Sequence, residues 1–454
     1  MVRRRAFLSA PLLGAGLGAA RSASPVREAA REMPIGDTHE HIYPEATRLK
    51  TKVDLFTLMG QYTGADLISA GMDSKARTAL NDAKLPVGER WRLAAPYWER
   101  ARNTGYARAF AITLRDIYGA AELNEKTCER ISEEITAANR PGLTQKILEQ
   151  RCRIRFAVLD DYFHPAPVAP ESAFYVPARR FDRFIALPSR EALQKLEQAL
   201  DTAITSLGDL EKALAADFER NLEVARMRVI KIGQAYLRPL HFGDPSRAEA
   251  ERDFEELARG AAPAAPASRY EQLTRPAARN LQDYMLHRVL RLARDQRRGR
   301  PIPVQIHTGI HAGNRNYIPN SNPAQLINLF FEYPEITFDL FHSSYPYLSE
   351  LAAIAKSFPN VFIDLTWIYI ISPAAAARAL DEYLDTVPAN KILGFGGDYN
   401  YAEMVWGHSV MAREIIAGVL EKKVAAGEFG PRRALALCRR LLHDNAAELF
   451  QPAG

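Results

Sequence analysis

Short apolar runs rich in β-branched residues recur in the second half of the chain, and each one ends in a polar residue. They repeat at intervals of about 30 residues, the spacing of a strand–helix unit, and occupy residues 302–307, 336–342, 361–367 and 392–398. The intervals between them carry helical periodicity, over residues 322–331, 347–357 and 373–384. Strands that alternate with helices predict a parallel sheet.

The first half of the chain carries fewer such runs and much more helical periodicity. Two clear runs occupy residues 153–161 and 228–233, and a further strand is expected at either 174–180 or 183–187. We predict an α/β fold, a (β/α)8 TIM barrel, as a single domain over residues 33–450. Because a minimal barrel takes about 250 residues, large helical insertions are expected, near residues 44–150, 190–226 and 239–279.

A His-x-His motif follows the apolar stretch Met33–Gly36, in the run Asp37-Thr38-His39-Glu40-His41. Side chains two positions apart on a strand point to the same side, so His39 and His41 can offer two imidazole nitrogens to one metal ion. The motif also arises by chance, and its meaning depends on the rest of the chain.

Later strand ends carry further residues of the same chemistry. Lys231 lies near the end of the fourth predicted strand, and His307, His342 and Asp398 close the fifth, sixth and eighth. In a barrel these ends meet at the carboxyl-terminal mouth. Each position also has a structural alternative: a hydrogen-bonded histidine, a lysine paired with a carboxylate, or an aspartate that caps a helix.

The order His-x-His, Lys, His, His, Asp resembles the amidohydrolase superfamily. The surroundings of His307, His342 and Asp398 are most similar to the amidohydrolase-related (amidohydrolase 2) branch, and the ending 445–450, Asn-Ala-Ala-Glu-Leu-Phe, is similar to one common there. Uronate isomerases are more distant relatives.

Imidazole and carboxylate suit Zn²⁺, with Mn²⁺ as the alternative, and we expect one or two ions. The resemblance implies that His39, His41, His307 and Asp398 bind metal, joined by Lys231 if it is carboxylated. Asp398 would also take the proton of the attacking water. His342 would ligate a second ion or hydrogen-bond the substrate carbonyl.

Further residues are candidates for contacts with the substrate. Trp367 ends the seventh predicted strand, and His311 follows His307 on a loop. Arg179, Arg180 and Arg238 could bind a substrate carboxylate, with surface positions as the alternative for all three.

The N-terminus resembles a twin-arginine export signal over residues 1–23, with Arg3, Arg4 and Arg5 before a short, weakly apolar stretch. This predicts a periplasmic protein. No later segment is long and apolar enough for a membrane span. The net charge of +5 gives no nucleic-acid signal, and the three cysteines suggest neither a disulfide framework nor a zinc site.

We therefore expect a metal-dependent hydrolase that cleaves an amide, lactone or ester-like bond of a small molecule. A small molecule that carries a carboxylate is a candidate substrate. A decarboxylase or uronate isomerase on the same scaffold is the first alternative, and a non-catalytic periplasmic binding protein is the second. A homo-oligomer is compatible with all three.

Overall fold

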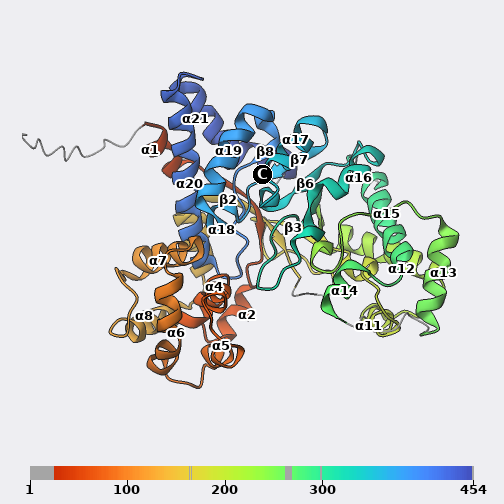
Figure 1. Ribbon diagram of the computed structural model, residues 1–454, viewed down its shortest axis with the longest axis horizontal. Coiled ribbons are helices and arrows are strands. Elements are labelled where there is room, and N and C mark those ends of the chain that lie inside the picture. The colour runs from red at the N-terminus through yellow and green to blue at the C-terminus, as the bar shows by residue number, and fades with distance from the viewer. Residues whose placement is uncertain (1–24, 163, 165, 261–267, 297–298, 452–454) are drawn as a thin grey trace, which may run out of the picture.

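The computed structural model describes residues 25–451, apart from residues 163, 165, 261–267 and 297–298 (Figure 1). The predicted export signal at residues 1–23 lies outside the described part of the chain.

Eight parallel strands form one sheet in which every strand pairs with the next along the chain. They are β1 Ile35–Glu40, β2 Ile154–Asp160, β3 Tyr175–Arg180, β4 Val229–Ile232, β5 Val304–Ile306, β6 Phe338–Leu340, β7 Val361–Asp364 and β8 Ile392–Leu393. Backbone hydrogen bonds from Thr38 N to Phe395 O and from Asp398 N to His39 O join β1 to the segment after β8. The sheet is thus a nearly closed barrel, and the predicted fold class is confirmed.

The third strand, which the sequence left open, is β3. The other candidate segment begins in the helix α10, Asp182–Ile185. The eighth strand is shorter than its apolar run because the chain leaves the sheet at Gly394. A Cβ on Gly394 would lie 2.3 Å from the Leu441 carbonyl oxygen, and one on Gly397 would lie 1.9 Å from Glu40 Oε1. Glycine at these positions lets the segment pass close to its neighbours on its way to the barrel mouth.

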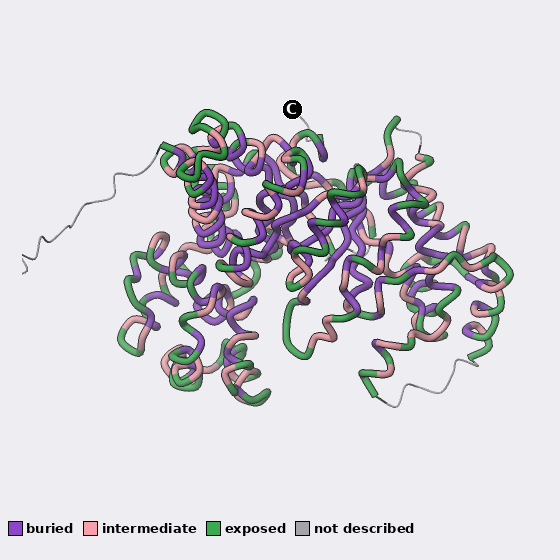
Figure 2. Tube along the Cα trace, turned by 45° about the horizontal axis from the view of Figure 1, so that its top comes forward, coloured by how far each residue is buried: buried purple, intermediate pink, exposed green. Residues whose placement is uncertain are grey.

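Helices follow the later strands as the periodicity predicts. They are α16 Ile327–Glu332, α17 Leu348–Ser357, α19 Pro373–Thr386 and α20 Ala402–Ala425, followed by α21 Pro431–Arg439 and α22 Asn445–Phe450. The first described helix, α1 (Pro25–Glu32), packs on α20 and α21. Buried residues concentrate in the barrel and beneath these helices (Figure 2).

The three segments predicted as insertions are largely helical. Between β1 and β2 lie α2 Glu45–Lys50, α3 Leu55–Gly60, α4 Thr63–Ser69, α5 Ser74–Asn81, α6 Val87–Ala101, α7 Gly105–Tyr118, α8 Cys128–Ala138 and α9 Leu143–Gln145. Most of them form a lobe at the lower left of Figure 1, where α7 packs against α20. On the other side lie α11 Arg190–Leu200, α12 Leu207–Glu223, α13 Arg247–Ala258, α14 Arg269–Thr274 and α15 Arg279–Asp295. None of the helices in the described part of the chain combines the length and apolar character needed to cross a bilayer.

Candidate metal centre and active site

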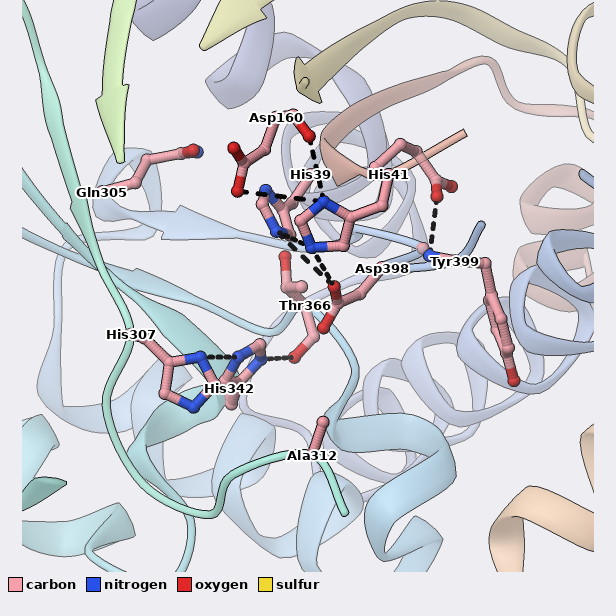
Figure 3. Close-up of polar contacts among 12 residues, drawn as sticks. His39, His41, Asp160, Gln305, His307, Ala312, His342, Thr366, Asp398 and Tyr399 are labelled. Carbon is pink, nitrogen blue, oxygen red and sulfur yellow. Dashed lines mark hydrogen bonds and ion pairs between the residues drawn. The ribbon is translucent and has the colours of Figure 1, made fainter. Parts of the chain in front are cut away.

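Three of the predicted ligands meet at the barrel mouth (Figure 3). His39 and His41 stand at the end of β1, and Asp398 follows β8. The two Nε2 atoms lie 3.2 Å apart, and Asp398 Oδ1 lies 3.5 Å from His39 Nε2 and 3.2 Å from His41 Nε2. His39 and Asp398 are buried, and His41 is half-buried. One strand and the segment beside it therefore place three donor atoms around one point.

The spacing and protonation of these donors fit a metal ion. His41 Nδ1 lies 3.1 Å from the Asp160 carbonyl oxygen, which can only accept, so the proton is on Nδ1 and Nε2 presents a lone pair. Zinc–nitrogen distances of about 2.0–2.1 Å in a tetrahedral site put ligand atoms about 3.4 Å apart. The observed separations of 3.2–3.5 Å match this value.

The Asp398 carboxylate is suited to remain charged in this setting. Burial alone would raise its pKa, but the groups around it, the neighbouring His41 imidazole first and the Lys231 amine among the others, outweigh burial and lower the pKa below its ordinary value. A carboxylate and two imidazoles thus form the donor set, a combination that zinc and related divalent ions accept.

His307 lies outside the group of donor atoms formed by His39, His41 and Asp398 and faces His342 (Figure 3). His307 Nδ1 lies 3.1 Å from His342 Nε2. The outer nitrogens, His307 Nε2 and His342 Nδ1, lie 3.1 Å from the carbonyl oxygens of Ile310 and Thr366. Carbonyls only accept, so both outer nitrogens are protonated and the inner ones face each other with lone pairs. Burial lowers the pKa of both rings, that of His342 to about 3, which keeps them neutral.

Lys231 projects from β4 toward the same region as a buried amine. Its Nζ lies 3.3 Å from the centre of the Phe341 ring and has no hydrogen-bond partner among the described residues. Burial and the charge of Arg180 lower the pKa of the amine to about 7. Lys231 therefore faces the site with a free nitrogen.

A cavity of about 490 Å³ lies above these groups. The barrel contributes His39, His41, Arg180, Lys231, His307 and Asp398 to its wall. The first insertion contributes Gln61, Tyr62 and Arg77, and the loops after β4 and β5 contribute Tyr236 and Asn314. The cavity is thus shared between the barrel and its first helical insertion.

Three of the predicted substrate contacts do not line this cavity. Arg238 is buried in an ion pair of 2.5 Å with Asp283, does not line the cavity, and its prediction as a substrate contact is not supported. Trp367 is also buried behind the cavity wall, with its ring centre 5.0 Å from that of His342. His311 stacks on Tyr236 at 4.4 Å, next to His307. The rings of Trp367 and His311 therefore pack behind the residues that line the cavity.

Of the three arginines that the sequence offered as substrate contacts, Arg180 is the one that lines this cavity. It ends β3, and its Nε and Nη2 lie 2.8 and 2.5 Å from Asp160 Oδ2, at the end of β2. Both Arg180 and Asp160 lie at strand ends, and this position in the sequence pattern could have indicated them as site residues. Gln61 and Tyr62 carried no such signal, because they lie between two insertion helices with no motif around them.

The comparisons with known proteins agree with this geometry. The family model described as amidohydrolase matches residues 203–451, more than half of the chain. Protein fluG of Emericella nidulans is 31% identical over 173 residues, which span 38% of this chain and only 20% of fluG.

Solved structures show the same fold over 94% of this chain. A uronate isomerase from Thermotoga maritima has a TM-score of 0.75 at 17% identity, with 96% of its chain covered. A glucuronate isomerase from Caulobacter crescentus has a TM-score of 0.72 at 18% identity, with 93% covered. A protein described as a metal-dependent hydrolase from Lactobacillus casei has a TM-score of 0.61 at 18% identity, with 97% covered. The barrel, the residues at its mouth and the family match lead to one conclusion: this chain belongs to the amidohydrolase family.

Proposed function

We propose that the protein is a metal-dependent hydrolase that cleaves an amide, lactone or ester-like bond of a small molecule. The observation that carries the proposal is the meeting of His39 Nε2, His41 Nε2 and Asp398 Oδ1 within 3.5 Å of one another at the cavity wall. These residues would hold one divalent ion, with Zn²⁺ first and Mn²⁺ second. Such an ion lowers the pKa of bound water toward about 7 and so supplies a nucleophile at neutral pH.

The chain's own groups have separate roles in this proposal. Asp398 stays ionised and can hold the proton released by the attacking water at a carboxylate oxygen. His342 presents a lone pair at Nε2, because the hydrogen bond to the Thr366 carbonyl oxygen keeps the proton of the ring on Nδ1. The unpartnered Nζ of Lys231 can donate to the oxygen of the substrate on which charge develops.

The position of Arg180 favours a substrate that carries an acidic group, such as a carboxylate. Its Nε and Nη2 bind Asp160, whereas no described side chain takes its Nη1. A guanidinium with a free edge at a cavity wall binds a carboxylate through charge-assisted hydrogen bonds.

The test is hydrolysis of a panel of lactones, N-acyl compounds and esters, with and without a carboxylate, by protein loaded with Zn²⁺ or Mn²⁺. We expect turnover of at least one acidic member, its loss on chelation and its return with metal. Full turnover by His39→Ala or Asp398→Asn protein would refute the assignment.

Aldose–ketose isomerisation of a uronic acid is the second candidate. It is favoured by the likeness to a uronate isomerase at a TM-score of 0.75 over nearly the whole chain, and by the cationic cavity wall at Arg180. Product analysis on uronates separates the two reactions, because isomerisation adds no water. Tight metal and acid binding without turnover of any compound would point to a binding protein.

We also propose export to the periplasm, on the sequence of Arg3, Arg4 and Arg5 alone. Replacing all three arginines by lysine and fractionating the cells tests it. Retention in the cytoplasm is expected, and unchanged export would refute a twin-arginine signal.

A further inference from the structure

The backbone of Asp398 adopts a conformation that non-glycine residues rarely take. Its φ is +61°, in the left-handed region, and its amide donates to the His39 carbonyl oxygen at 2.8 Å. Residues held in this region persist where their surroundings over-determine them. The direction of the carboxylate therefore depends on what holds this peptide.

The carbonyl of Asp398 is held by two side chains of the first insertion. Gln61 Nε2 donates to it at 3.2 Å, and the Tyr62 hydroxyl donates to it as well. The Gln61 Oε1 accepts from Asn400 N at 2.9 Å. One amide side chain thus binds the backbone on both sides of Tyr399, and a phenol reinforces it.

Tyr62 is itself fixed in place. Its φ is +56°, and only 8% of its surface is exposed. Its ring centre lies 4.8 Å from that of Trp367 and 5.3 Å from that of Tyr106. Burial raises the pKa of its hydroxyl well above 10, so the hydroxyl keeps the proton that it donates.

We propose that Gln61 and Tyr62 are positioning residues that lock the Asp398 peptide and so aim its carboxylate at His39 and His41. Both residues belong to the connection between α3 and α4, which lies more than 330 residues before Asp398 in the sequence. The first insertion thereby completes the geometry of the barrel's metal site as well as lining its cavity. The inference rests on the metal site proposed above.

The decisive variants are Tyr62→Phe and Gln61→Met. Tyr62→Phe keeps the stacked ring and removes the hydroxyl, and Gln61→Met removes both hydrogen bonds of the side-chain amide. Tyr106→Phe is the matched control, because it removes a hydroxyl from the adjacent ring of the same stack. Metal-free protein is titrated with Zn²⁺ against a competing chelator. Hydrogen exchange of residues 395–400 is then compared with that of residues 338–344.

We expect Tyr62→Phe and Gln61→Met each to weaken Zn²⁺ binding about ten-fold, the lower end for loss of a group that supports a ligand. Exchange should accelerate at residues 395–400 and stay unchanged at 338–344, with Tyr106→Phe like wild type. Wild-type affinity and exchange in both variants would overturn the inference. Wild-type protein that binds no Zn²⁺ would instead overturn the metal site itself.

Discussion

Arg48, in the first insertion, and Glu403, at the start of α20, form an ion pair of 2.5 Å in which both side chains are almost completely buried. The Tyr118 hydroxyl donates to the same Glu403 Oε1 at 3.3 Å. The lobe that lines the cavity is thus tied by a desolvated charge pair to the helix that follows β8 and Asp398.

Replacing Arg48 by Met should lower the free energy of unfolding by about 3–5 kcal/mol, because Glu403 is left buried without its counter-charge. Urea denaturation at pH 7 measures the loss. Arg102→Met is the control: its pair with Glu99 is exposed, and such pairs contribute about 1 kcal/mol or less. A loss of similar size in the two variants would show that the buried pair does not stabilise the junction.

The contact of α7 with α20 depends on the lack of a side chain at Gly407. A Cβ there would lie 2.0 Å from the Ala109 carbonyl oxygen, and backbone cannot yield as a side chain can. Gly407→Ala should lower the free energy of unfolding by about 1–3 kcal/mol, measured by urea denaturation. Gly418→Ala in the same helix meets its nearest atom, on Arg27, only at 3.7 Å and should stabilise by up to about 1 kcal/mol. Equal effects of the two substitutions would contradict close packing at Gly407.

Replacing Arg180 by Lys should raise KM for acidic substrates while kcat changes less. Lysine retains a positive charge beside Asp160 but cannot form the planar, two-pronged contact. Loss of one charge-assisted hydrogen bond, about 1.5–3 kcal/mol, corresponds to roughly 10–100-fold in kcat/KM. The methyl ester of the same substrate is the control and should respond little. An equal loss for the acid and its ester would argue that Arg180 acts through Asp160 and His41 instead.

His408 should contribute to the pH dependence of the free energy of unfolding. Burial lowers the pKa of this ring to about 4, whereas in the unfolded chain it lies near 6.5. The unfolded chain therefore binds more protons between pH 6.5 and 4, and the free energy of unfolding falls as the pH falls through that window. The share is up to about 1.4 kcal/mol per pH unit. His408→Gln should lose stability less steeply in urea titrations from pH 7.5 to 4.5, and a slope equal to wild type would exclude this residue.

Metal binding should stabilise the folded protein. A ligand that binds only the native state at 100 times its Kd raises the free energy of unfolding by about 2.7 kcal/mol. We expect this gain when Zn²⁺ is added to chelator-treated wild type, measured by urea denaturation in a non-chelating buffer. Asp398→Asn should gain much less, since a charged donor is lost. The same gain in both proteins would place the bound ion elsewhere.

The fold and the positions of the candidate ligands could largely be predicted because they follow from local patterns. Apolar runs with a polar last residue marked the strands, and parallel strands bring their ends together by geometry. His39, His41 and Asp398 do meet at the mouth. The same pattern did not separate Arg180, which lines the cavity, from Arg238, which is buried against Asp283.

By itself, the sequence determined that this chain is a barrel with histidines and an aspartate at its strand ends, because hydrophobic period and strand–helix spacing are properties of neighbouring residues. The tertiary structure alone decided which polar groups meet: His307 with His342, Arg180 with Asp160, and Tyr62 with the Asp398 carbonyl. Such contacts join residues from 20 to 336 positions apart. They arise from how the insertion packs on the barrel, which local periodicity does not encode.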